Sequence, residues 1–251
     1  MNLSPRPVAW LKAGEKFPAL SSAWGSEEAA PGLLAAGGVL DVNSLIRAYG
    51  AGIFPWFSLG QPILWWSPNP RMVLLTRDFK LHRSLKKTLQ RFRNSPTSTV
   101  TFDTAFDQVI SACAHASRDG QSGTWIVPEM IAAYSQLHKS GYAHSIETWV
   151  HGELVGGLYC VNMGGMVFGE SMFAHQTDAS KIALSALVAF CKAKGISMID
   201  CQQNTTHLSS FGAREIEREL FASHVSHQTG RDTPVWVFSP HHWNEILPTQ
   251  T

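Results

Sequence analysis

Two residues at the end of the segment "ISMIDCQ" (196–202) are of types that could do chemistry together. The segment predicts a strand, in which side chains alternate between the two faces, so Asp200 and Gln202 would share a face with Cys201 opposite. A carboxylate beside an amide can orient a nucleophile, and open sheets tend to bind ligands beyond the carboxyl ends of their strands. The alternative is that Asp200 only caps a turn.

A second carboxylate, Glu170, follows a glycine at the end of another apolar segment, "FGESMFAH". A carboxylate there could bind a cationic group. It could equally cap the loop that follows.

The segment "DFKLHRSLKKTLQRFRN" (78–94) predicts a helix that starts at Asp78. One face repeats apolar residues at helical spacing: Leu81, Leu85, Leu89 and Phe92. The other face collects cations, namely Arg77, Lys80, Arg83, Lys86, Lys87, Arg91 and Arg93. Such a face is often simply solvated. Since the formal net charge of the chain is only +1, the cluster could instead contact a nucleic-acid backbone.

The segment "GIFPWFSLGQPILWWSPNPR" (52–71) raises a different question, because it places three tryptophans among four prolines. Each proline removes a backbone donor and fixes φ, so the segment cannot form one regular element. We call residues 52–71 the aromatic ribbon. Rigid aromatic surface of this kind suits a preformed pocket for an apolar group.

Several function classes leave no trace in the sequence. The eleven histidines and four cysteines form no recognisable set of metal ligands, and no metal site or cofactor is expected. A nucleophile elbow, a P-loop and a GxGxxG motif are missing too. The cysteines, without a CxxC pair, favour reduced thiols. With no signal-peptide pattern and no apolar run near 20 residues, we expect a cytoplasmic protein without a membrane partner.

The order of elements predicts an α+β protein. Helices are expected after Asp41, in 78–94, after Asp103, from Pro128 to Gly141, and over "TDASKIALSALVAFCKAKG" (177–195). Strands are expected at "RMVLLT" (71–76), in an antiparallel meander over about 143–173, and at 196–202. Residues 225–251 resist assignment.

The aromatic ribbon resembles the signature of the leucyl/phenylalanyl-tRNA–protein transferase family. Other segments resemble that family in the same order, from about residue 31 to 215: "GLLAAGG", "GTWIVPEMIAAYSQLHKSGYAHSIE", "GELVGGLY", "GESMF", "ASKIAL" and "IDCQ". The resemblance implies a smaller N-terminal α/β domain (1–76) packed on a C-terminal domain (77–251) with a fold like the Gcn5-type acetyltransferases.

The resemblance also implies an activity, the transfer of Leu or Phe, and less readily Met, from aminoacyl-tRNA to proteins with N-terminal Arg or Lys. The products would be marked for degradation by the N-degron pathway. An aminoacyl-tRNA ester is already activated, so the reaction requires no ATP site, metal or covalent nucleophile. An α-amino group is partly neutral at pH 7, so positioning it is the main task.

By resemblance, the strand pair Asp200 and Gln202 lies at the reaction centre, with Gln202 bonding the amine and Asp200 orienting it or helping to take up its proton. The terminal ribose hydroxyl of the tRNA is an alternative proton carrier. Glu170 would hold the cationic end of the acceptor. The donor side chain would lie in an apolar pocket, whose expected residues are Tyr49, Trp56, Trp125, Tyr134, Leu158, Val167, Phe173 and Leu187.

Three further expectations concern the floor of the pocket, the basic helix and the domain seam. Val167 and Leu187 stand where some family members are expected to carry larger aromatic residues, which would widen the floor of the pocket. Arg83, Lys86 and Lys87 would contact the acceptor end of the tRNA. Trp65 and Trp66 are expected at the domain seam.

Two rival functions stay open from the sequence. An acyl-CoA-dependent N-acetyltransferase would suit the element order, but "GESMFAHQTDASK" lacks the glycine-rich loop that cradles pyrophosphate. A non-enzymatic binder would use the aromatic ribbon without changing its ligand.

Overall fold

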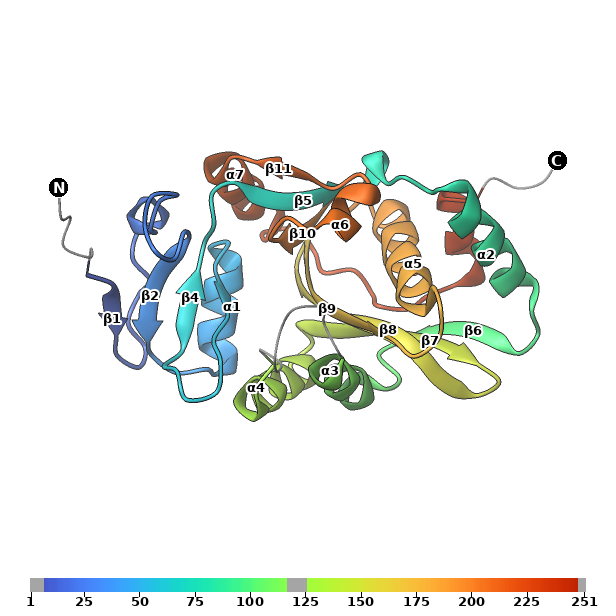
Figure 1. The fold of residues 1–251 in the computed structure, drawn as a ribbon, viewed down its shortest axis with the longest axis horizontal. Helices are drawn as coiled ribbons and strands as arrows, with labels where there is room; N and C mark the ends of the chain where they lie inside the picture. Colours follow the sequence, from blue (N-terminus) through green and yellow to red (C-terminus); the bar gives the residue numbers. More distant parts are fainter. Residues whose placement is uncertain (1–6, 117–125, 248–251) are drawn as a thin grey trace.

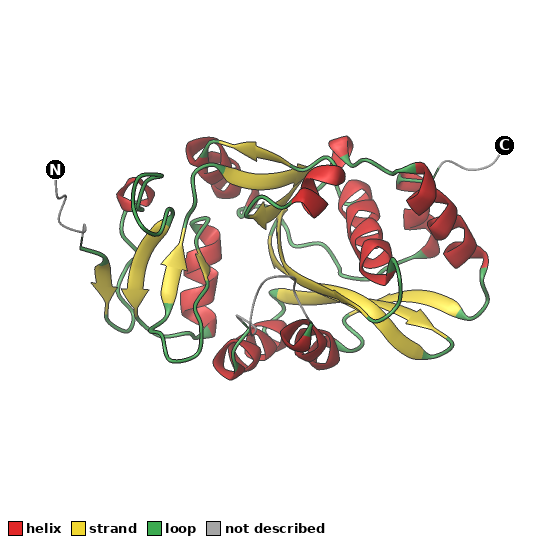
Figure 2. Cartoon of the chain, in the orientation of Figure 1, coloured by secondary structure: helices red, strands yellow, loops and turns green. Residues whose placement is uncertain are grey.

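The computed structural model describes residues 7–116 and 126–247, which form a mixed α+β structure with two sheets (Figures 1 and 2). The smaller sheet has the strand order β1-β2-β4-β3. Its members are β1 (Ala9–Leu11), β2 (Leu33–Gly37), β3 (Phe54–Pro55) and β4 (Leu64–Trp66). The aromatic ribbon therefore supplies two short strands, and β4 pairs with both β2 and β3.

The larger sheet has the order β11-β5-β10-β9-β8-β7-β6. Its strands are β5 (Arg71–Leu75), β6 (Ser98–Phe102), β7 (Ala143–Val150), β8 (Glu153–Met163), β9 (Met166–Ala174), β10 (Met198–Gln202) and β11 (Arg214–Ile216). The predicted meander is confirmed as β7-β8-β9, since these strands pair antiparallel. Strand β10 pairs parallel with β9 and antiparallel with β5.

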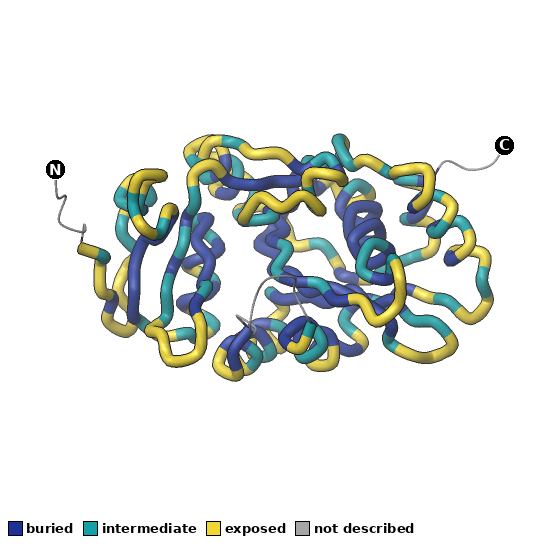
Figure 3. The backbone as a smooth tube through the Cα atoms, viewed as in Figure 1, coloured by how far each residue is buried: buried dark blue, intermediate teal, exposed yellow. Residues whose placement is uncertain are grey.

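Helices cover both faces of the larger sheet (Figure 1). On one face lie α3 (Phe106–His115) and α4 (Pro128–Lys139), and on the other α5 (Ala179–Ala193). Helix α1 (Val42–Gly50) lies between the smaller sheet and α4. Two further helices follow β10 and β11, α6 (Thr206–Ser210) and α7 (Arg218–Gln228). Figure 3 shows long buried stretches, which include most of α5 and β8.

The helix starts follow local signals in the sequence. Asp41 caps α1 as predicted, because its Oδ1 accepts a hydrogen bond of 2.7 Å from the Ser44 amide. Pro128 occupies the first turn of α4, where its missing N–H costs nothing. The chain leaves α5 shortly before Gly195, whose φ of 67° suits a glycine.

The predicted start of the basic helix at Asp78 is wrong, since α2 spans Arg83–Asn94. The residues before it are held by another part of the chain. The Lys80 amide donates to the Phe211 carbonyl over 2.8 Å, and His82 bonds the Ser210 carbonyl over 2.7 Å. These contacts with the end of α6 take the place of a first helical turn. The apolar face is confirmed for Leu85, Leu89 and Phe92, which are buried, whereas Leu81 precedes α2 and is only partly buried.

The chain passes from the smaller to the larger sheet between Trp66 and Arg71. Strand β5 thus belongs to the larger sheet, and not with the segment 1–76 in which the sequence analysis grouped it. One hydrophobic cluster nevertheless runs from Trp65 through Tyr49 to Phe168, and so joins both sheets. The division into two domains stays a prediction.

The C-terminal segment, unassigned from the sequence, completes a second hydrophobic cluster beside α5. Trp236, Trp243 and Leu247 are buried in it. The Trp236 ring also stacks on His144 of β7, with 4.0 Å between centroids. Residues 236–247 therefore act as a cover over the core between α5 and the sheet.

Candidate active site

The candidate site lies where strands β9 and β10 stop pairing. Their parallel register joins Ile199 to Val167 and Asp200 to Phe168. Strand β9 then continues along β8 as far as Ala174. Glu170 and Gln202 follow this point on their two strands, so the sheet itself brings the two predicted side chains together where the parallel pairing of β9 and β10 ends.

Glu170 and Gln202 are in direct contact. The Gln202 Nε2 donates to Glu170 Oε1 over 3.0 Å. On its other oxygen, Glu170 accepts a hydrogen bond of 3.3 Å from the Tyr134 hydroxyl of α4. The Tyr134 hydroxyl also bonds the Tyr49 hydroxyl of α1. A continuous polar chain therefore runs from α1 to the end of β10, with both tyrosines buried.

Asp200 does not stand free in this site. Its side chain is 0% exposed and forms a two-point ion pair with Arg71 of β5, which is also 0% exposed. Arg71 Nε donates to Oδ1 over 2.7 Å and Nη2 to Oδ2 over 2.6 Å. Parallel hydrogen bonds of this kind are the strongest form of carboxylate recognition. Arg71 was not among the predicted site residues; its one signal in the sequence is a cation that opens an otherwise apolar strand.

An irregularity in β10 positions Gln202. The prediction that Asp200 and Gln202 follow the regular side-chain alternation of a strand is therefore wrong in detail. The register with β5 shifts between Asp200 and Gln202, which leaves Cys201 as the extra residue of a bulge. Gln202 has a φ of 57°, a left-handed conformation that costs a non-glycine residue about 1–3 kcal/mol. The backbone N–H of Gln202 donates to Asp200 Oδ1 over 3.0 Å, and this hydrogen bond holds the backbone conformation.

The electrostatics of the site centre on Glu170. Burial raises the pKa of Glu170 from 4.5 to about 8; the Asp200 carboxylate adds to this, and hydrogen bonds with Tyr49 and Tyr134 partly offset it. Burial, and next to it the Glu170 charge, also raises the pKa of Tyr49 and Tyr134 well above 10. The two phenols therefore stay protonated and can donate, and a cation beside Glu170 would favour its ionised form.

The structure brings part of the predicted pocket together. Tyr49 lies between Tyr134 and Phe168, with ring centroids 6.5 and 5.0 Å apart. Phe173 is buried in the same cluster, and Trp56 packs against it from the aromatic ribbon. Trp125 lies outside the described residues. These side chains come from β9, the aromatic ribbon, α1 and α4.

The remaining predicted pocket residues lie elsewhere. Leu158, Val167 and Leu187 are at most 3% exposed and belong to the second cluster, beneath α5. Strand alternation explains the split, because the neighbours of the first two, Tyr159 and Phe168, face the cluster that contains Tyr49. The predicted residues therefore do not line one cavity. Leu158, Val167 and Leu187 stay predicted contacts only for a donor group that reaches the α5 face.

The aromatic ribbon is more ordered than its prolines suggested. The Trp66 indole donates to the Trp56 carbonyl over 2.7 Å, and the two rings lie 5.4 Å apart. Trp56 and Trp66 are only partly buried. Trp65, expected at the seam, instead packs inside the smaller sheet, where its indole donates to the Gly37 carbonyl and its ring meets Phe17. The ribbon thus holds the Trp56–Trp66 pair at the surface of the joint core.

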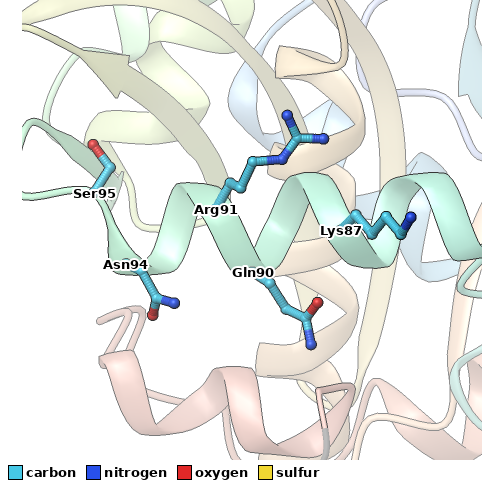
Figure 4. A pocket seen from close by; sticks show the side chains of 5 residues that line it. All are labelled: Lys87, Gln90, Arg91, Asn94 and Ser95. Atoms are coloured by element: carbon cyan, nitrogen blue, oxygen red, sulfur yellow. The ribbon is translucent and has the colours of Figure 1, made fainter.

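The basic face of α2 carries the residues predicted to bind tRNA. Arg83 and Lys87 are exposed and Lys86 is partly buried. An open hollow of about 520 Å³ lies on this helix. Figure 4 shows the side chains that line it, those of Lys87, Gln90, Arg91, Asn94 and Ser95. Thr88 of α2 also bonds Asp178 just before α5, over 3.4 Å. The cations of α2 therefore form one accessible surface, attached to the helix that supports the larger sheet.

Two further findings concern residues 7–116 and 126–247. No group of three or more His, Cys, Asp or Glu side chains there has a geometry that could hold a metal ion. Within the same ranges, the helices are too short or too polar to cross a lipid bilayer.

Comparison with known proteins gives clear relatives. The chain matches the family model described as leucyl/phenylalanyl-tRNA protein transferase over residues 73–226, and the model of the N-terminal domain of that family over 38–69. A leucyl/phenylalanyl-tRNA–protein transferase from Polaromonas sp. is 64% identical over 250 residues, which are 100% of this chain and 98% of the relative. One from Albidiferax ferrireducens is 55% identical over 251 residues, 100% and 99% of the two chains.

Solved structures are less similar. A conserved protein of unknown function from Bacteroides thetaiotaomicron overlaps with a TM-score of 0.39 at 17% identity, over 56% of this chain and 53% of the other. That overlap carries no argument about the fold. The expected likeness to Gcn5-type acetyltransferases stays a prediction.

Proposed function

Because the chain belongs to the leucyl/phenylalanyl-tRNA protein transferase family, we propose that it moves Leu or Phe, and less readily Met, from aminoacyl-tRNA to proteins with N-terminal Arg or Lys. The enzyme class, an aminoacyltransferase acting from tRNA to protein, follows from the family. The choice of acceptor and the roles of individual residues form the proposal. The product would be a protein marked for degradation by the N-degron pathway.

The acceptor proposal rests on one observation, the contact between Glu170 and Gln202 where β9 and β10 separate. Glu170 offers a carboxylate to the guanidinium or ammonium group of the first acceptor residue. The side-chain amide of Gln202 donates to Glu170 through Nε2, and its Oε1 therefore points to the other side of the carboxamide. An oxygen in that position can accept an N–H of the acceptor α-amine and leave the nitrogen lone pair free to attack.

The chemistry requires little beyond this alignment. The amine nitrogen bonds to the ester carbonyl carbon, the bond from that carbon to the ribose oxygen breaks, and the amine proton passes to the departing ribose oxygen. The sequence analysis left open whether Asp200 takes up the proton. Both Asp200 oxygens already accept hydrogen bonds from Arg71, which favours the ribose as proton carrier and a positioning role for Asp200. Alignment of this kind supplies much of the rate enhancement in bimolecular reactions.

The aminoacyl-tRNA donor would be held at two places, its aminoacyl side chain and its acceptor stem. Trp56, which is only partly buried, packs against the cluster that contains the buried Tyr49 and Tyr134 beside Glu170, and it would supply apolar surface for the donor. Surface complementarity alone separates similar side chains by about 1–3 kcal/mol per methylene, so Leu, Phe and Met would be told apart only modestly. The cations of α2 would meet the phosphates of the acceptor stem, without reading its sequence.

A mass-shift assay tests the proposal. Purified enzyme and charged leucyl-tRNA are incubated without ATP, with one peptide that begins with Arg and a second, otherwise identical, that begins with Ala. The Arg peptide should gain the mass of one leucyl residue, and the Ala peptide should stay unchanged. Transfer to both peptides would refute the acceptor proposal, and transfer to neither would refute the reaction.

A further inference from the structure

We infer that Arg71 is a positioning residue of the transfer reaction. It fixes Asp200, and through Asp200 it fixes the backbone amide of Gln202 and so the direction of the Gln202 side chain. The inference rests on the proposed function in one respect, that Gln202 meets the attacking amine. It adds a residue that the sequence motifs did not indicate, and it assigns to Asp200 a role other than proton uptake.

The first step is the fixation of Arg71 itself. Its Nη1 donates to the Gly52 carbonyl of the aromatic ribbon over 3.2 Å. Its guanidinium carbon lies 4.7 Å from the ring centroid of Phe54 and 4.4 Å from that of Phe221. Contacts from β3 and α7 thus enclose the guanidinium between aromatic rings. Arg71 has one orientation that satisfies all of them, since its donors form a rigid planar fork.

The second step is the transfer of this rigidity to Asp200. The two hydrogen bonds from Arg71, of 2.7 and 2.6 Å, fix both carboxylate oxygens. A single-point partner such as Lys could neutralise the same charge but could not hold the carboxylate plane. The orientation of the carboxylate plane matters because Asp200 Oδ1 also accepts a hydrogen bond of 3.0 Å from the backbone N–H of Gln202.

The third step is the conformation of Gln202. Its φ of 57° is sparsely populated by residues other than glycine, so it persists only where neighbouring groups impose it. The bond from its amide to Asp200 Oδ1 is such a constraint. This backbone conformation aims the side chain at Glu170, which it meets over 3.0 Å. Loosening Arg71 would therefore release Gln202 from Glu170.

The test compares Arg71→Lys with a matched control, Arg218→Lys. Arg218 also bonds a backbone carbonyl, that of Ser67, over 2.9 Å, but it has no ion pair with Asp200. Steady-state kinetics would use leucyl-tRNA and an Arg-initiated peptide, and the side-chain NH₂ signals of Gln202 would be followed by ¹⁵N NMR without substrate. Comparison with Gln202→Glu identifies those signals.

In Arg71→Lys we expect kcat to fall at least tenfold while KM for both substrates changes less than twofold, and the Gln202 NH₂ signals to move toward those of solvent-exposed glutamines. Arg218→Lys should change neither readout. A kcat within twofold of the unmodified enzyme, or unmoved Gln202 signals, would overturn the inference. If Arg71→Lys does not fold, Asp200→Asn serves instead: the same two changes are expected, and unmoved Gln202 signals would overturn it.

The NMR readout is independent of activity. If the unmodified enzyme transfers nothing, the proposed function fails, while the signals of Gln202 still report whether Arg71 fixes it. The two failures are therefore distinguishable.

Discussion

The replacement Glu170→Gln tests how the enzyme recognises its acceptor. It removes the carboxylate charge but keeps the size of the side chain and an oxygen that can accept from Tyr134. Since the pKa of Glu170 is raised to about 8, only about 9% of the free enzyme carries the charge at pH 7, and about half does at pH 8. A cationic acceptor that binds the ionised form should therefore bind more tightly as the pH rises.

The size of this effect follows from the ionised fraction. Affinity for an Arg-initiated peptide should rise about ninefold from pH 6 to pH 7 and about fivefold from pH 7 to pH 8, then level off. Binding would be measured by calorimetry in the absence of tRNA. The α-amine of the peptide titrates in the same range, so the difference between the unmodified enzyme and Glu170→Gln isolates the contribution of Glu170. A Gln-initiated peptide serves as the neutral control.

The affinity of Glu170→Gln for the Arg-initiated peptide should be low, and it should lack the increase with pH that comes from ionisation of Glu170. An equal pH dependence in both proteins would refute the assignment of Glu170. Stability gives a second check. The pKa of Glu170 is raised on folding, so its contribution to the free energy of unfolding is fully present below about pH 4.5 and is lost as the pH rises to about 8. The melting temperature of Glu170→Gln should lack this decline.

Three further replacements test the other parts of the site. Gln202→Ala should lower kcat about tenfold or more, with little change in aminoacyl-tRNA binding, because misplacing a reacting group is costly; an unchanged kcat in single-turnover kinetics would remove Gln202 from the mechanism. Lys86→Ala with Lys87→Ala should weaken tRNA binding and reduce the slope of log K against log salt by about 1 to 2, measured by filter binding; the same slope as in the unmodified enzyme would show that α2 does not contact phosphates. Trp56→Ala should raise KM for leucyl-tRNA and phenylalanyl-tRNA alike by roughly tenfold, about 1.4 kcal/mol; if neither KM moves, the Trp56–Trp66 pair is scaffold.

Local signals in the sequence predicted helices α1 to α5 and strands β5 and β7 to β10, but not the four strands of the smaller sheet. Asp41 and Pro128 mark helix starts through groups that lie within one turn of the helix. The start of α2 was misplaced because residues 80–82 bond the end of α6, which is more than 100 residues away along the chain. Contacts of that range leave no periodic pattern.

The candidate site was predicted in part. Glu170, Gln202, Tyr49 and Tyr134 meet as one hydrogen-bonded set; residue type and strand position had singled out Glu170 and Gln202, whereas Tyr49 and Tyr134 came from the resemblance alone. Arg71 was missed because a charged residue in a short strand does not reveal its partner, here 129 positions later. Leu158 and Val167 were grouped with the aromatic residues because a list of apolar positions does not specify which face of a strand each occupies.

The most direct test of the account is a crystal structure of the enzyme with an Arg-initiated peptide and a non-hydrolysable aminoacyl-adenosine. We predict the guanidinium of the peptide against Glu170, its α-amine within hydrogen-bond distance of Gln202 Oε1, and its nitrogen facing the carbonyl carbon of the donor. A peptide bound with its first residue away from both Glu170 and Gln202 would contradict the account.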